Sequence, residues 1–151
     1  MATKPVYVLN GPNLTLLGLR EPHLYGSETF ADLAERCRRK AKALGLAADV
    51  RQSNLEGEIV GWIQDARDAA CGIVVNAGAY THTSIAIHDA LRAADVPVIE
   101  VHLSNIFRRE EFRHHSYVSL VAKGVICGFG TIGYELALEA VNDVLKSVKD
   151  A

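Results

Sequence analysis

The chain has 151 residues, 49% of them hydrophobic, and a formal net charge of −2 at pH 7. This size and apolar content predict one compact domain with a continuous core, and the near-neutral charge argues against nucleic acid or an anionic membrane as a partner. Residues 1–5 contain no apolar signal-peptide region and no apolar run reaches transmembrane length, so we expect a cytoplasmic protein.

Short β-rich runs alternate with amphipathic segments along the chain. The expected strands are residues 6–9, 48–52, 73–75, 98–101 and 125–127, and the expected helices are 29–44, 56–70, 84–94 and 134–149. Thr29 is a suitable cap for the first helix, and Gly45 a suitable stop. Four of the strands are apolar runs, which is typical of a sheet covered on both faces. We therefore predict a flavodoxin-like, doubly wound, five-stranded parallel sheet of order 2-1-3-4-5 with helices on both faces.

A long loop, residues 9–26, follows the first strand and carries amides, an arginine, a histidine and a tyrosine between glycines and prolines. Its length without periodicity indicates a functional loop, and its leucines argue against disorder. Tyr25 could act as a base if its pKa fell well below about 10, which a nearby guanidinium such as that of Arg20 would favour. A tyrosine that only packs its ring and hydrogen-bonds its hydroxyl remains the alternative.

In doubly wound sheets, ligands bind beyond the carboxyl ends of the strands. The polar residues that this chain places there are Asn10, Asn13, Ser53, Asn54, Asn76, residues 80–82, His102, Ser104 and residues 128–131. We expect them to converge on one crevice, although the turn preferences of Asn, Ser and Gly explain part of the pattern.

Glu100 and His102 alternate onto one face of the fourth strand, so the carboxylate could orient the histidine for acid-base chemistry. A histidine that only hydrogen-bonds at a strand end is the alternative. The run 108–115 adds positive charge beside that strand end, and one of its arginines could clamp a carboxylate, but spacing does not select which.

Metal and nucleophilic sites lack support in the sequence. There is no Cys-x-x-Cys, His-Glu-x-x-His or Gly-x-Ser-x-Gly motif, and the adjacent His114 and His115 would point in different directions. The glycines at 128, 130 and 133 are a weak phosphate signal that a tight turn or helix packing explains better. We therefore expect no metal.

With these residues identified, the chain resembles the type II 3-dehydroquinate dehydratases along essentially its whole length. The resemblance is carried by residues 9–26, 52–58, 76–84, 98–105 and 108–117. One departure is Thr15, where family members often have asparagine. The resemblance implies a single catalytic domain over residues 1–151 that dehydrates 3-dehydroquinate to 3-dehydroshikimate without a cofactor. It also implies a role in the shikimate pathway, and thus in aromatic amino acid biosynthesis, or in quinate catabolism.

The resemblance further implies a role for each candidate residue in a stepwise elimination through an enolate. Tyr25 would be the base, Arg20 would lower its pKa, and Asn13 would hold a water at the developing enolate oxygen. His102, oriented by Glu100, would protonate the departing hydroxyl. The implied substrate-binding residues are Asn76, His82, Asp89, Leu103, Ser104 and Arg113. Asp89 would reach a neighbouring subunit's site in a dodecamer built of trimers.

Two other functions are compatible with this architecture. A flavodoxin-like ligand-binding or signalling domain without catalysis would share the architecture. However, residues 11–16 lack the Ser, Thr and Gly of a flavin-phosphate loop, and Asn76 stands where a phospho-acceptor domain needs an aspartate. A catalytically dead scaffold is disfavoured by the presence of Tyr25, Arg20 and His102.

Overall fold

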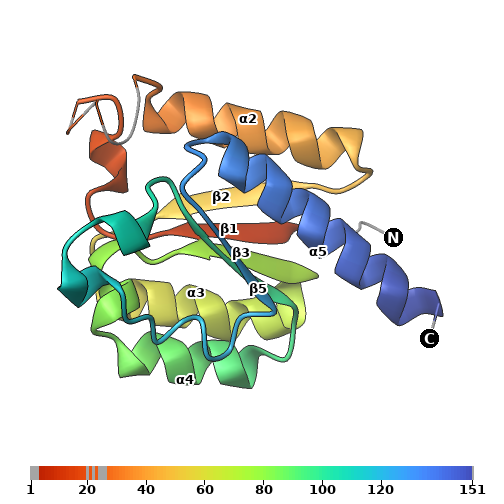
Figure 1. Cartoon of the computed structure of the whole chain (residues 1–151). Helices are drawn as coiled ribbons and strands as arrows, with labels where there is room; N and C mark the ends of the chain where they lie inside the picture. The colour runs from red at the N-terminus through yellow and green to blue at the C-terminus, as the bar shows by residue number, and fades with distance from the viewer. Residues whose placement is uncertain (1–3, 20, 22, 24–26, 151) are drawn as a thin grey trace.

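The computed structural model describes residues 4–19, 21, 23 and 27–150. Over these residues, five strands form one parallel sheet in the order β2-β1-β3-β4-β5 (Figure 1). The strands are β1 Val6–Asn10, β2 Ala48–Gln52, β3 Gly72–Asn76, β4 Val98–His102 and β5 Gly124–Cys127. The predicted fold class and strand order are confirmed.

Four long helices in the described part of the chain cover the two faces of the sheet. They are α2 Phe30–Ala43, α3 Glu56–Ala69, α4 Ile85–Ala94 and α5 Ile132–Asp150. Thr29 caps α2 through a reciprocal pair of hydrogen bonds with Asp32, and Ser84 caps α4 by accepting from the Ile87 amide. Gly45 follows α2 with a φ of 77°, a conformation that glycine adopts without strain. The predicted boundaries hold to within two residues.

Alternation along the strands divides the core into two layers. In β1, Tyr7 and Leu9 pack against the layer of α3 and α4, whereas Val6 and Val8 pack against the layer of α2 and α5. Figure 1 shows these helix pairs on opposite faces of the sheet. The three central strands, β1, β3 and β4, are buried along their whole length because helices cover both faces of the sheet there, whereas the edge strands β2 and β5 are partly exposed.

Short 3-10 turns follow three of the strands at one edge of the sheet. They are η1 Leu14–Leu16 after β1, η2 Gly78–His82 after β3, and η3 Ile106–Arg108 and η4 Glu111–Arg113 after β4. Parallel strands bring their carboxyl ends to the same edge, so these turns gather around one place. No helix in the described residues is long and apolar enough to cross a membrane.

Candidate active site

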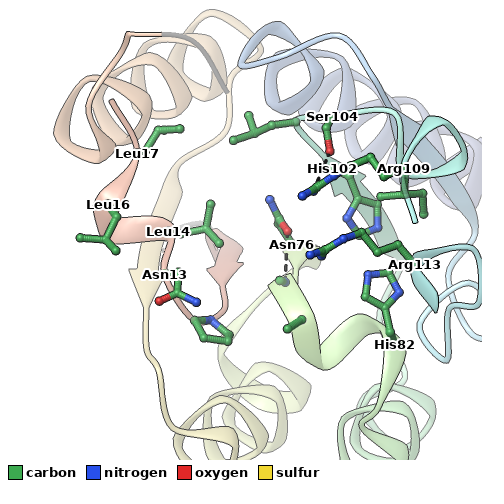
Figure 2. A pocket seen from close by; sticks show the side chains of 15 residues that line it. Asn13, Leu14, Leu16, Leu17, Asn76, His82, His102, Ser104, Arg109 and Arg113 are labelled. Carbon is green, nitrogen blue, oxygen red and sulfur yellow. Dashed lines mark hydrogen bonds between the residues drawn. The ribbon is translucent and has the colours of Figure 1, made fainter. Parts of the chain in front are cut away.

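A cavity of about 120 Å³ opens at the carboxyl edge of β1, β3 and β4, where the strand order reverses (Figure 2). Such a switch point is the usual ligand site of a doubly wound sheet. The turn after β1 forms one wall, η2 lies below, and the end of β4 with η3 and η4 forms the opposite wall. The lining residues are Pro12, Asn13, Leu14, Leu16, Leu17, Asn76, Gly78, Ala79, His82, His102, Leu103, Ser104, Ile106, Arg109 and Arg113.

A glycine sets the distance between the first two walls. The Gly11 amide donates to the Asn76 carbonyl at 2.8 Å, and a Cβ at position 11 would lie 2.2 Å from the Ala77 carbonyl oxygen. No side chain fits in that space. The chain after β1 therefore packs directly on the chain after β3, and Asn13 and Asn76 come to line the same cavity.

Glu100 and His102 lie on one face of β4, as the alternation along the strand predicts. His102 Nε2 lies 2.5 Å from Glu100 Oε2, and Ser116 and Ser119 donate further hydrogen bonds to the same carboxylate at 2.9 and 2.5 Å. Burial tends to raise the pKa of Glu100, but the hydrogen bonds from His102 and the two serines outweigh it and hold that pKa below its usual value. Glu100 is therefore ionised near neutral pH. His102 Nε2–H donates to it, and Nδ1 is the ring nitrogen that remains for the cavity.

His82 comes from η2 and faces the cavity beside Arg113 (Figure 2). Its Nδ1 lies 2.8 Å from the His115 carbonyl oxygen, which can only accept, so Nδ1 carries the hydrogen. Burial lowers the pKa of His82, and the charge of Arg113 adds to the lowering. A neutral ring with a hydrogen on Nδ1 leaves Nε2 as an acceptor.

Two arginines line the wall that follows β4, although sequence reasoning took only one of them as a substrate ligand. Arg113 Nε lies 2.6 Å from Glu110 Oε2, and the less exposed Arg109 donates from Nη1 to Ser104 Oγ at 3.3 Å. No local sequence signal selects Arg109: its backbone and that of Glu110 are extended, so the four-residue spacing between the arginines does not place them on one side of a helical turn. The cavity thus combines two fixed positive charges with the histidines.

The structure brings most of the predicted site residues together. The cavity wall includes Asn13, Asn76, His82, His102, Leu103, Ser104 and Arg113, and Glu100 lies directly behind His102. Asp89 is exposed on α4 and does not line this chain's cavity. Arg20 and Tyr25 lie outside the described residues.

The expectation that all the strand-end polar residues converge on the crevice is wrong for several of them. Asn10 is fully buried in the core, Asn54 Oδ1 accepts from the Asn13 amide, and the Tyr80 hydroxyl donates to the Asn54 carbonyl. The polar groups of these residues are already paired, so they support the cavity wall and do not face the cavity. Residues 128–131 and Ser53 also lie outside the wall: Gly128 and Gly130 turn the chain with positive φ, and Ser53 Oγ accepts from the Leu55 amide.

No cluster of three or more His, Cys, Asp or Glu side chains suited to a metal ion occurs in the described part of the chain. The chemistry that these residues can perform is proton transfer by a carboxylate-oriented histidine, together with binding of an anionic, hydroxyl-rich small molecule by arginines, asparagines and the neutral His82. The fold and the cavity thus define a doubly wound α/β protein with a hydrogen-bonded histidine and glutamate beside a cavity at its switch point.

Comparison with known proteins names the family. The model of the family described as dehydroquinase class II matches residues 4–142. A 3-dehydroquinate dehydratase of Mesorhizobium japonicum is 61% identical over 139 residues, covering 91% of this chain and 96% of that protein. "3-dehydroquinate dehydratase 2" of Pseudomonas aeruginosa is 58% identical over 137 residues, covering 91% and 93%. The crystal structure of a type II dehydroquinase from Propionibacterium acnes matches with a TM-score of 0.90 at 50% identity, covering 93% of this chain and 97% of that one. The chain belongs to the class II dehydroquinases, the family of type II 3-dehydroquinate dehydratases.

Proposed function

We propose that this protein dehydrates 3-dehydroquinate to 3-dehydroshikimate by a stepwise elimination through an enolate, as a single catalytic domain without a cofactor. The family and the activity named for the similar proteins support the reaction. The observation that carries the mechanism is the buried pair of His102 and Glu100, 2.5 Å apart at the cavity wall.

In the first step, the Tyr25 phenolate removes the proton α to the ketone, and the electron pair of the broken C–H bond moves to the carbonyl oxygen to form the enolate. Arg20 stabilises the phenolate, and Asn13 holds a water at the enolate oxygen. Asn13 lines the cavity, in support of this role. Glu21 Oε2 lies 4.0 Å from Nη2 of Arg109, so Glu21 itself lies near the cavity wall.

In the second step, the enolate re-forms the ketone, its electron pair makes the new carbon-carbon double bond, and the hydroxyl leaves as water with a proton from His102. Glu100 holds the ring through Nε2 and stabilises the imidazolium that is needed before the transfer. Two serines keep the Glu100 carboxylate in place. The burial of this pair excludes water, which strengthens the electrostatic interaction between its members.

Substrate binding is assigned to groups whose chemistry matches a hydroxylated carboxylate. Arg113 is suited to a carboxylate or hydroxyl, and the backbone amides of Leu103 and Ser104 to the carboxylate. Asn76 and the Nε2 acceptor of His82 are suited to hydroxyl groups. Arg109 lies in the same wall and adds positive charge for an anionic substrate.

Asp89 belongs to this proposal as a residue that serves a neighbouring site. It is exposed on α4, as a residue that reaches another subunit must be in the isolated chain. We propose a dodecamer of trimers in which Asp89 completes the adjacent cavity. We also propose that the protein is cytoplasmic and takes part in aromatic amino acid biosynthesis or quinate catabolism.

The test is an ultraviolet assay for the conjugated enone product with purified protein and 3-dehydroquinate. We expect absorbance to rise with the wild-type protein and to stay flat with His102→Ala, whose fold is checked by circular dichroism. Ser147→Ala, an exposed serine on α5 that bonds only to its own helix in the described contacts, is the matched control and should retain full turnover. A wild-type protein with no turnover of 3-dehydroquinate would contradict the proposed reaction.

A further inference from the structure

Tyr134, in the first turn of α5, connects two strand ends across the core. It is 0% exposed, and its hydroxyl lies 2.6 Å from Asn10 Oδ1 and 2.9 Å from Asn76 Nδ2. Asn10 ends β1 and Asn76 ends β3. Asn76 lines the cavity, whereas Tyr134 does not touch it. A buried tyrosine thus contacts a site residue from behind.

The hydrogen bonds that link the side chains of Asn10, Tyr134 and Asn76 can run in one direction only. Asn10 Nδ2 donates to the backbone carbonyls of Arg51, at 3.1 Å, and Val8, at 3.4 Å. Carbonyls accept and never donate, so the Asn10 amide must point its nitrogen at them and its oxygen at Tyr134. The single hydroxyl hydrogen of Tyr134 is then used on Asn10, and its oxygen can only accept from the Asn76 amide nitrogen.

The hydrogen bond on the other side of Asn76 indicates the same direction independently. The Gly78 amide donates to Asn76 Oδ1 at 3.2 Å, an interaction drawn in Figure 2, so this side of Asn76 must be the oxygen. Both neighbours therefore select the same orientation of the Asn76 amide. One Nδ2 hydrogen goes to Tyr134, and the second is left for the cavity that Asn76 lines.

We propose that Tyr134 is a positioning residue, which locks the Asn76 amide so that it donates a hydrogen bond to an oxygen of the bound substrate. This inference rests on the proposed function and adds a residue to it. Without the Tyr134 hydroxyl, only the Gly78 amide would hold the Asn76 side chain, so the amide group would be less restricted and would donate less well to an acceptor in the cavity. With both contacts, the cavity offers a fixed donor at Asn76 in addition to the acceptor nitrogen of His82, which favours a defined orientation of the substrate hydroxyls.

Burial keeps the lock in one state. Desolvation raises the pKa of the Tyr134 hydroxyl well above its usual value, so the hydroxyl stays protonated and continues to donate to Asn10. The polar groups of Asn10, Tyr134 and Asn76 are all paired except the Asn76 hydrogen that faces the cavity. No other orientation of these side chains therefore has a similar energy.

Tyr134→Phe tests the proposal, because it keeps the ring and removes only the hydroxyl. We expect KM for 3-dehydroquinate to rise roughly five- to tenfold, as expected from the loss of one oriented hydrogen bond, with kcat within about twofold of wild type. Tyr7→Phe is the matched control. Tyr7 is 4% exposed in β1, and its ring lies under the Arg51 guanidinium at 4.3 Å. The KM of the Tyr7→Phe protein should equal that of the wild type.

A double-mutant cycle distinguishes positioning from a general structural role. In an Asn76→Ala background, Tyr134→Phe should raise KM no further, because the group that it orients is absent. Effects that multiply would overturn the proposal. Asn10→Ala is a second, independent variant, since it removes the acceptor that directs the Tyr134 hydrogen, and the same rise in KM is expected.

The outcomes separate this inference from the proposed reaction. Wild-type turnover of 3-dehydroquinate decides the reaction before any variant is measured. If the wild type is active and a folded Tyr134→Phe or Asn10→Ala protein has an unchanged KM, the positioning role is refuted and the reaction stands.

Discussion

Replacing Glu100 by glutamine tests how far the acid-base site depends on one buried carboxylate. Glu100 is 1% exposed and accepts hydrogen bonds from three side chains, His102, Ser116 and Ser119. Glutamine keeps the shape but offers one acceptor oxygen, and its amide nitrogen donates. A glutamine oxygen at the Oε2 position can still accept from His102 and Ser116, but the Ser119 hydroxyl would have to turn and accept from the amide nitrogen.

The cost follows from these contacts. A hydrogen bond to a charged group contributes about 1.5–3 kcal/mol, so losing the charge and one acceptor oxygen should lower the free energy of unfolding by about 2–4 kcal/mol. Glutamine can still accept from His102 Nε2–H, but it removes the negative charge that would stabilise the imidazolium. General acid catalysis typically contributes about 10²–10⁴-fold, so kcat should fall by at least about 10²-fold, or roughly 2.7 kcal/mol in the barrier.

The assay combines ultraviolet detection of product with urea unfolding of the same preparation. Glu35→Gln is the control, because Glu35 is paired only with exposed arginines of its own helix, α2, in the described contacts. That change should alter stability by less than about 0.5 kcal/mol and leave kcat unchanged. A folded Glu100→Gln protein with kcat within about threefold of wild type would refute the dependence of His102 on the carboxylate.

Three further predictions concern the base, the absence of covalent and metal chemistry, and acid stability. Tyr25→Phe should lower kcat by about 10²–10⁴-fold with an unchanged circular dichroism spectrum, and near-normal turnover would exclude Tyr25 as the base. Borohydride with substrate, and separately a chelator, should leave activity intact, since no lysine lines the described cavity wall; inactivation by borohydride would indicate an imine intermediate. Stability to urea should fall as the pH drops below about 6.5 and again below about 4.5, because the lowered pKa values of His82 and Glu100 make the unfolded chain bind protons first. Glu100→Gln should reduce the second fall, to which the lowered pKa values of Asp32 and Glu110 also contribute, and an identical pH profile in that variant would contradict the assignment.

The sequence predicted the sheet well because its signals are local. Runs of apolar residues identify strands buried on both faces, and alternation along the chain with helices fixes the parallel arrangement. The predicted ends of three strands are one residue short, at Asn10, Asn76 and His102. These polar residues resemble the start of a loop, yet each still pairs in the sheet and is buried at its edge.

The site was only partly predictable, because local sequence signals do not show which distant residues contact one another. Glu100 and His102 lie two residues apart, so strand periodicity alone places them on one face, and their hydrogen bond confirms that placement. The partner of Asn10 is Tyr134, 124 positions away, and no local pattern indicates that the amide turns into the core and not into the cavity. Arg109 and Arg113 have the same residue type in the same run, so their selection needed the path of the chain after β4.

The close contact between Gly11 and Ala77 makes residue 11 intolerant of any side chain. The smallest side chain, a single methyl group, would have to move the two loops apart by about an ångström to reach an ordinary contact distance. Displacements of that size between reacting groups cost roughly 10²-fold in rate. In a library varied at residue 11, selection for activity should return glycine even among members that still fold. Redesign of this pocket for a larger molecule could start from that position, where adding atoms to the protein would widen the space for the ligand.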